Sequence, residues 1–298
     1  MRRRRRALAL AWVPALAALT VAPTPSIEGV ARAGAPAPRS CHAPDGRAQI
    51  PPGDAWVGED GDARPGRPTP VPAFDIDRHE VTNRQFAAFV TATGYVTEAE
   101  RQGGGAVFAA PTTPVALDNA ARWWTWSKGA SWRAPNGPGS AAARQPDDPV
   151  VQVTYADAAA YAQWAGRALP TEAQWERAAR GLQTQGRPQS AWAYGDDGRP
   201  IANTYQGVFP VVDEGTDGHR GLAPAGCFPA NDFGVYDMIG NAWEWTTALA
   251  PDGQRRVVKG GSFLCAFNYC ANFRPAGWQA QEIDLPTSHI GFRTVSRG

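Results

Sequence analysis

Glycine and proline are too frequent in this chain for it to fold into long helices. Among 298 residues there are 32 glycines and 27 prolines, together with 12 tryptophans. Glycine and proline destabilise a helix interior more than any other residue, so short elements joined by irregular backbone are expected. Hydrophobic residues make up 43% of the sequence, which is enough for a packed core. We therefore expect a loop-rich fold anchored by large aromatic side chains.

The overall charge gives no indication of a nucleic-acid partner. The chain has 29 basic and 28 acidic residues, a formal net charge of +1. Nucleic-acid-binding proteins usually carry a clear basic excess, so no such partner is expected.

The first residues have the pattern of a secretory signal peptide. Arg2 to Arg6 form a basic start, and an apolar run follows from Ala7 to Ala22. Small residues allow cleavage after Ala22 or after Ala33. A membrane anchor is the alternative, but the apolar run is short for a bilayer span. We predict that residues 1–33 are a signal peptide and that the mature chain is exported, periplasmic or extracellular, without membrane attachment.

The remainder of the chain is predicted to be one domain behind a short linker. Residues 34–47 are a flexible lead-in, and no internal repeat or linker interrupts 48–298. Cleavage leaves 24 basic and 28 acidic residues, or 23 and 27, so the mature chain has a net charge of −4. Export also makes disulfides possible.

Local signals predict a few short elements. A glutamine three residues after a threonine forms a capping box at two helix starts, with Gln85 and Gln174. The segment 103–146 lacks periodicity but is rich in tryptophan, and no helix is predicted after Ala191. The predicted elements are strands within 48–58 and 74–81 and helices that begin at Thr82, Thr154 and Thr171.

The four cysteines fall into two sets. Cys265 and Cys270 lie five residues apart in the run GGSFLCAFNYC. On a straight strand they would point to opposite faces, so they can face each other only across a bend. Two thiolates suit Cu(I), and a structural disulfide is the alternative. Cys41 and Cys227 are isolated in the sequence and are expected to pair with each other.

Two polar segments are candidates for calcium binding. In YDMIGNAWEW, which begins at Tyr236, a carboxylate lies among aromatic residues and needs a cation or hydrogen-bond donors. Asn203 with Asp217 forms a similar set, and calcium accepts both carboxylates and backbone carbonyls. Neither segment is an EF-hand loop, so capped turns remain the alternative.

Longer runs of the chain resemble the formylglycine-generating enzymes, also called sulfatase-modifying factors, over about residues 46–295. The matching runs include HEVTNRQFAAFV, GYVTEAE, WWTWSKGASWRAPNGP, NDFGVYDMIGNAWEW, VVKGGSFLC and HIGFR. The resemblance implies a single irregular α+β domain of the formylglycine-generating type, related to C-type lectin-like folds and low in regular structure.

The resemblance also implies an activity and a site. The family uses O2 to convert a cysteine in a C-x-P-x-R stretch of a sulfatase to Cα-formylglycine. A monomer that acts on a protein or peptide thiol is therefore expected. By resemblance, the copper ligands are Cys265 and Cys270, with Ser262 and Tyr269 beside them. The substrate side is expected to involve Trp124, Trp278, Asp284 and His289.

Calcium ligands follow from the same resemblance. The first set is Asn203, Thr204, Asp217 and His219, of which Thr204 and His219 offer carbonyls. The second set is Asp237, Gly240, Ala242 and Glu244, with carbonyls from the two small residues. Asp237 stands where the family usually has asparagine.

Several positions depart from the family pattern on the substrate side. Trp278 stands in place of an arginine, Ala266 in place of a histidine and His289 in place of an asparagine. An Asn-Thr-Pro run is replaced by Gln281, Glu282 and Ile283, whereas Asp284 and Arg274 match. Two alternatives therefore remain open: an exported copper-dependent oxidase of a different thiol, or a non-catalytic relative that binds copper or another ligand.

Overall fold

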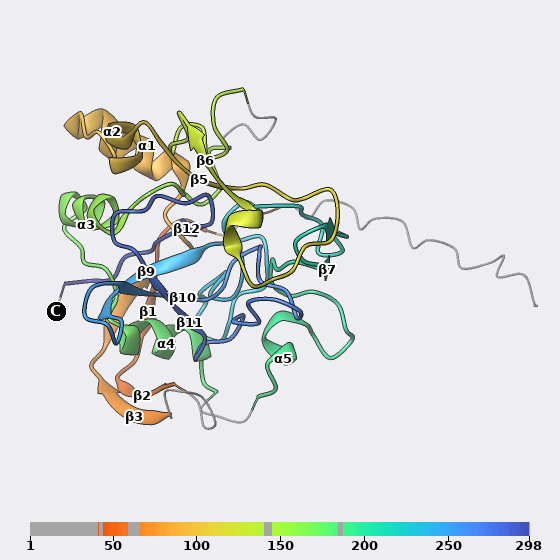
Figure 1. Cartoon of the computed structure of the whole chain (residues 1–298). Helices are drawn as coiled ribbons and strands as arrows, with labels where there is room; N and C mark the ends of the chain where they lie inside the picture. The colour runs from red at the N-terminus through yellow and green to blue at the C-terminus, as the bar shows by residue number, and fades with distance from the viewer. Residues whose placement is uncertain (1–40, 42–43, 59–65, 140–144, 184–186, 298) are drawn as a thin grey trace, which may run out of the picture. The chain divides into compact units, whose positions relative to one another are not determined.

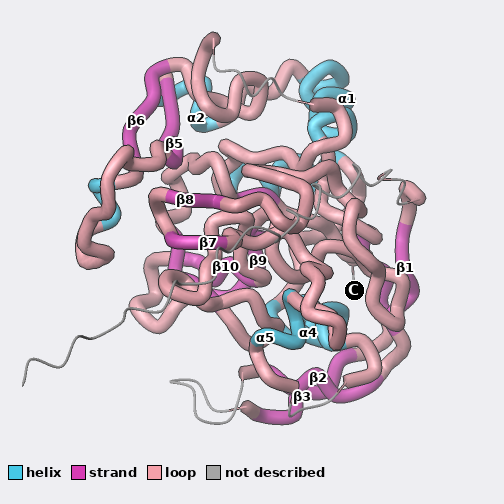
Figure 2. Tube along the Cα trace, turned by 90° about the vertical axis from the view of Figure 1, so that its right-hand side faces the viewer, coloured by secondary structure: helices cyan, strands magenta, loops and turns pink. Residues whose placement is uncertain are grey.

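Short helices and strands joined by long loops make up the chain, as its glycine and proline content predicts (Figures 1 and 2). The computed structural model describes residues 41, 44–58, 66–139, 145–183 and 187–297. All of them belong to one compact unit, residues 35–298. The predicted signal peptide and most of the predicted lead-in lie outside the described residues. None of the described helices is long and apolar enough to cross a membrane.

The three predicted helices are present where the local signals place them. Thr82, Thr154 and Thr171 are N-caps with capping boxes. Gly166, just after the C-cap of the second of these helices, has a φ of 70°. The helices are α1 (Asn83–Thr93), α2 (Glu98–Gln102), α3 (Tyr155–Trp164), α4 (Glu172–Arg180) and α5 (Ser190–Ala193), with a 3₁₀ turn at Ala120–Arg122.

Sequence patterns missed two short helices. The second helix, α2, has its own capping box, between Thr97 and Glu100. The fifth helix, α5, spans Ser190–Ala193, so the prediction that no helix occurs from Ala191 onward is wrong. Each spans about one turn, which is too short for the 3.6-residue periodicity to become visible in a sequence.

A four-stranded sheet lies at the centre of the unit, in the order β11–β10–β9–β12. Its first three strands are antiparallel, whereas β12 runs parallel to β9. The other strands form separate pairs, β1–β4, β2–β3, β5–β6 and β7–β8. The strands are β1 (Arg47–Ile50), β2 (Gly53–Val57), β3 (Arg67–Val71), β4 (Phe74–Asp77), β5 (Gly104–Phe108), β6 (Trp124–Lys128), β7 (Gly207–Val208), β8 (Val212–Asp213), β9 (Trp243–Leu249), β10 (Arg256–Lys259), β11 (Trp278–Gln281) and β12 (Ile290–Gly291).

The helix α4 packs beside the central sheet, with the β2–β3 pair on its other side (Figure 1). Glu176 of α4 and Lys259 of β10 form a fully buried ion pair at 2.7 Å. The indole of Trp175, also in α4, donates to Glu244 of β9 at 2.8 Å. These contacts hold α4 against β9 and β10, and β10 leads into the cysteine loop.

The tryptophan-rich segment that has no sequence periodicity folds partly as the β5–β6 pair. Its register places Phe108 opposite Trp124. The segment 103–146 is therefore less irregular than its sequence indicates. Two strands can pair without a regular alternation of apolar and polar residues when few of their side chains are buried. The predicted disulfide between Cys41 and Cys227 is also present, and it joins residues 186 positions apart.

Candidate active site

The two remaining cysteines lie at the ends of a tight turn and face each other. Residues Ala266 and Tyr269 exchange backbone hydrogen bonds of 2.9 and 3.1 Å, which reverses the chain between the thiols. Cys270 has a φ of 53°, in the left-handed region. The two sulfur atoms are 2.8 Å apart and both cysteines are free thiols. The bend that the sequence requires is therefore observed, and the disulfide alternative is not the state seen here.

A glycine provides the left-handed backbone conformation behind the first thiol. Gly261 has a φ of +80°, and a Cβ there would meet the sulfur of Cys265 at 3.4 Å. The backbone NH of Cys265 donates to the carbonyl of Ser262 at 2.9 Å, and the Ser262 hydroxyl accepts from Leu264 NH. The GGS run thus brings the backbone close behind the first thiol, which is fully buried.

Aromatic side chains enclose a cleft of about 260 Å³ around the thiols. Tyr269 stacks on Phe209 with ring centroids 4.4 Å apart, and Trp123 packs edge-on against Tyr269 at 5.3 Å. Trp124 meets the ring of His289 at 4.7 Å on the wall of the cleft. Apolar rings around the thiols disfavour water next to the sulfur atoms.

Burial dominates the electrostatics of the cleft. It raises the pKa of Cys265 well above its ordinary value, and the neighbouring Cys270 raises it further. Burial alone lowers the pKa of His289 to about 3, so this imidazole is neutral at physiological pH. Burial also raises the pKa of Tyr269. Without a bound cation, Cys265 and the aromatic wall around it therefore carry no charge.

The cleft brings together most of the predicted site residues, but not all of them. Ser262, Tyr269, Trp124 and His289 line it together with the two cysteines. Trp278 and Asp284, predicted on the substrate side, are not part of its lining. Gln281, which the sequence places among the substrate-side departures, lines the cleft as well. Side chains of the lining that the sequence did not indicate include Phe209, Trp243, Gln279, Leu285 and Thr287.

The donor chemistry of the thiol pair fits Cu(I). Soft thiolates select this ion, and two of them converge here at one wall of the cleft. The aromatic surroundings offer no competing oxygen or nitrogen ligand from a charged side chain among the described lining residues.

The first predicted calcium set forms a closely bonded polar cluster. The carboxylate of Asp217 accepts from the backbone NH groups of His219 and Thr204 and from the side-chain amide of Gln206. That amide also contacts the carbonyl of Thr204. Asn203 donates to Gly221 and Asn241. The Asp217 carboxylate is thus held by NH donors, as expected for the capped turn that is the alternative to a calcium site.

The second predicted set contains more negative charge than the sequence revealed. Glu244 accepts two 2.7 Å hydrogen bonds from Arg293. Glu80, a buried carboxylate that sequence reasoning missed, interacts electrostatically with Asp237 and Glu244. Burial, followed by Asp237, raises the pKa of Glu80, and burial raises the pKa of Asp237 to about 6. Three enclosed carboxyl groups thus gather near one arginine, and the raised pKa values of Glu80 and Asp237 mean that these two hold protons more readily than exposed carboxyl groups do.

No cluster of three or more His, Cys, Asp or Glu side chains within the described ranges is arranged to hold a metal. Gly240 and Ala242 would contribute only backbone carbonyl oxygens to the second predicted set of calcium ligands. At Gly240 a Cβ would come within 2.1 Å of the Asn203 carbonyl. This close approach joins the two predicted sets through their backbones, since Asn203 and Gly240 also form a β-bridge.

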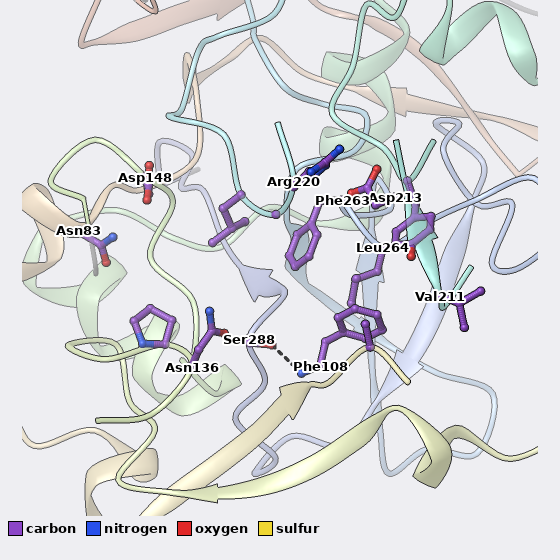
Figure 3. Close-up of a pocket in the computed structure, with 15 residues that line it drawn as sticks. Asn83, Phe108, Asn136, Asp148, Val211, Asp213, Arg220, Phe263, Leu264 and Ser288 are labelled. Atoms are coloured by element: carbon purple, nitrogen blue, oxygen red, sulfur yellow. Dashed lines mark hydrogen bonds between the residues drawn. The ribbon is translucent and has the colours of Figure 1, made fainter. Parts of the chain in front are cut away.

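A larger cavity of about 440 Å³ lies next to the cleft (Figure 3). Leu264 lines both, and Ser288 faces this cavity whereas its neighbours Thr287 and His289 face the cleft. Ser288 accepts a 3.3 Å hydrogen bond from Phe108 NH. In Figure 3, Asn83 and Asp148 lie at one end of the cavity and Val211 lies at the other. The described lining of this cavity contains no cysteine.

The fold and the thiol cleft together define an irregular α+β protein with a pair of free cysteines at the base of an aromatic cleft. Residues 33–297 match the Sulfatase-modifying factor enzyme 1-like domain, and the chain belongs to this FGE-sulfatase family. The family membership and fold class predicted from the sequence are thus confirmed.

Individual relatives refine this result. The chain is 45% identical over 266 residues to the formylglycine-generating enzyme of Thermomonospora curvata, covering 80% of this chain and 86% of the relative. It is also 39% identical over 270 residues to the inactive Cα-formylglycine-generating enzyme 2 of Mus musculus, covering 87% and 86%. Among solved structures, PvdO of Pseudomonas aeruginosa matches with a TM-score of 0.55 at 21% identity, covering 84% of this chain and 93% of PvdO. This last similarity concerns the fold alone.

Proposed function

We propose that this protein is an exported, copper-dependent oxidase that uses O2 to convert a cysteine of a protein substrate to Cα-formylglycine. The observation that carries the proposal is the pair of free thiols, 2.8 Å apart, at the wall of an aromatic cleft. The similarity to named formylglycine-generating enzymes supports it. The Cys41–Cys227 disulfide supports an oxidising compartment.

The reaction sets clear chemical requirements. The methylene carbon that bears the substrate thiol becomes an aldehyde carbon, its carbon–sulfur bond breaks, and the sulfur leaves as hydrogen sulfide. With O2 as oxidant, atoms and electrons balance when an external thiol reductant supplies two electrons and two protons, and the second oxygen atom leaves as water. Cu(I), held by Cys265 and Cys270, would supply thiolate binding and O2 activation.

The residues of the chain have separate tasks in this reaction. Cys265 and Cys270 must release their protons to hold the metal, since thiolates are the ligands. The rings of Trp123, Phe209 and Tyr269 shield the sulfur atoms from water. The Tyr269 hydroxyl, whose pKa is raised by burial, stays protonated and can donate a hydrogen bond beside the thiols.

Replacing either thiol tests the proposal. The anaerobically loaded protein should bind Cu(I) one to one and, after exposure to air with a thiol reductant, convert a cysteine peptide to its formylglycine form. Cys265→Ser and Cys270→Ser should each lose both properties, measured by copper titration and by mass spectrometry of the peptide. An unchanged far-UV circular dichroism spectrum is the control for folding. Full turnover by either variant would contradict the proposal.

A non-catalytic, copper-binding protein is the second candidate, because an inactive mouse protein is 39% identical to this chain. The same experiment separates the two. Tight Cu(I) binding without O2 consumption on any thiol peptide would favour the non-catalytic protein, whereas peptide conversion would exclude it.

We also propose that calcium occupies the two predicted sets around Asp217 and Asp237. The three enclosed carboxyl groups near Arg293 support this assignment for the second set, because a bound cation would favour their ionised form. Removing calcium with a chelator should lower the midpoint of thermal unfolding, because a ligand bound only to the native state stabilises it. Added calcium should restore the midpoint and magnesium should not. An unfolding midpoint that chelation leaves unchanged would contradict the proposal.

A further inference from the structure

The described residues that line the thiol cleft include no lysine, arginine, aspartate or glutamate. The one imidazole among them is that of His289, which is buried and packed on Trp124. The polar groups of the wall are neutral amides and hydroxyls, those of Gln279, Gln281 and Thr287 among them. Apart from the thiolates that would hold copper, a substrate segment that enters this cleft therefore meets no side chain of opposite charge.

The charged residues next to the part of the cleft wall formed by β11 do not change this conclusion. Arg256 lies directly opposite Gln281 across the sheet, and its guanidinium is 4.5 Å from the centre of the Tyr155 ring. The acids that flank β11 are exposed: Glu282, which lies 3.8 Å from Arg255, and Asp284. The charged side chain that lies opposite the cleft wall across the sheet is thus that of Arg256, a cation.

These surroundings disfavour a substrate that places an arginine in the cleft together with its reacting cysteine. Moving a guanidinium out of water without a charged partner costs several kcal/mol even after relaxation. A neutral side chain avoids this cost and can bond to the amides of Gln279 and Gln281. The aromatic rings of the cleft in turn favour apolar groups.

We propose that the substrate is a polypeptide cysteine whose flanking residues are uncharged, so that a neutral side chain is preferred where a C-x-P-x-R segment carries arginine. The proposal rests on the function proposed above, since it assumes that the cleft receives the substrate cysteine. It assigns specificity to Gln279, Gln281 and Thr287 on the cleft wall.

Competition between two peptides tests the preference. One peptide contains C-x-P-x-R and the other C-x-P-x-Q, and they are otherwise identical. The copper-loaded protein should convert the glutamine peptide with a kcat/KM at least about tenfold higher, as a desolvation cost above about 1.4 kcal/mol implies. Equal conversion, or preference for the arginine peptide, would overturn the proposal.

A binding measurement tests the preference for a neutral peptide independently of the oxidation reaction. Peptides with serine in place of the cysteine are titrated into the copper-loaded protein, and tryptophan fluorescence reports occupancy of the cleft. Tighter binding of the neutral peptide supports the substrate class even if no peptide is oxidised, a result that would count against the proposed function alone. Equal binding, or tighter binding of the arginine peptide, counts against the substrate class even if turnover occurs.

A designed change of specificity gives a second test. Gln279 faces Val258 across the sheet, so Gln279→Glu introduces a carboxylate with no cation opposite. This variant should shift the ratio of kcat/KM toward the arginine peptide by about tenfold or more, the gain expected from a paired charge in a poorly solvated site. Gln281→Glu should shift it less, because Arg256 lies opposite and offsets the new charge.

The matched control is Gln254→Glu, which adds the same charge in an exposed turn. It should leave the peptide ratio unchanged. If Gln279→Glu and Gln281→Glu both leave the ratio at the value of the unaltered protein, these side chains do not contact the substrate and the proposal is wrong. Because two separate variants are tested, the proposal can still be tested if one of them fails to fold.

Discussion

Two predicted metal ligands, Asp237 and Cys270, have left-handed backbone conformations. Among the described residues other than glycine, such conformations occur at Gln152, Asp237, Asn241 and Cys270. Asp and Asn tolerate this region because their short side chains bond locally, whereas Cys270 has no such compensation. A strained residue persists only where its surroundings over-determine it. The turn between the thiols therefore has a conformational cost that the packing of Tyr269 against Phe209 and Trp123 offsets.

A single carboxyl group beside the larger cavity should make stability depend on pH. Burial raises the pKa of Asp148 to about 6. The native state therefore holds this proton more tightly than the unfolded state, and stability falls as pH rises from about 4 to about 6. Asp148→Asn should remove this fall and stabilise the protein at neutral pH by on the order of 1 kcal/mol, a value reduced for solvent screening.

Urea unfolding of both proteins at about pH 4 and pH 7 measures this effect. The free energies of unfolding should differ at neutral pH and converge in acid. A variant less stable than the original protein at neutral pH would show that the ionised carboxylate is stabilising.

At the scale of elements, threonine capping boxes start four of the helices. Each box satisfies backbone NH groups that the first helical turn leaves unpaired. The helix α4 also has a tertiary role, since Trp175 and Glu176 hold Glu244 and Lys259 of the central sheet. A local cap thus supports contacts that position the strand β10 ahead of the GGS run.

Loss of the exposed cap of α4 should weaken the fold without altering the cleft. Thr171 accepts a 3.1 Å hydrogen bond from Gln174 NH and its own NH donates to the Gln174 side chain. Thr171→Ala should lower the free energy of unfolding by about 1 kcal/mol, measured by denaturant titration, while Thr171→Ser should retain most of it. An equal loss in both variants would show that the methyl group, not the cap, is responsible.

At the scale of the whole molecule, one covalent bond joins the start of the described chain to a distant loop. Cys41 and Cys227 close a loop of 186 residues, and Cys227 packs with Ala223 and Phe228 in a small separate cluster. Closing a long loop restricts the unfolded state, which favours the native state in the chain-entropy model.

Removing this bond should destabilise the protein by about 2–5 kcal/mol. The comparison is made in a background that carries Cys265→Ser and Cys270→Ser, so that reductant acts on one bond only. Thermal unfolding of Cys41→Ser with Cys227→Ser in this background should begin at a lower temperature. A reductant should lower the unfolding temperature of the background protein to the same value and leave the double variant unchanged. A reductant effect on the double variant would contradict this assignment.

Features whose signals are local in the chain could be predicted from the amino-acid sequence. Capping boxes located two of the three predicted helices, and an apolar run that ends at Gly166 located the third. The GGSFLCAFNYC run showed that the two thiols can face each other only across a bend. Each of these signals depends on residues a few positions apart. Long matching runs identified the family. The one-turn helices α2 and α5 escaped because they are shorter than the period that reveals a helix.

Which distant residues meet depends on the tertiary structure. It pairs β1 with β4 rather than with β2, encloses Glu80 beside Asp237, and places Gln279, Gln281 and Thr287 in the cleft in place of Trp278 and Asp284. Burial and partner charge depend on contacts across the whole chain, and no pattern of neighbouring residues encodes them. The position of the thiol pair could therefore be predicted from the sequence, whereas the neutral character of the cleft wall depends on the tertiary structure.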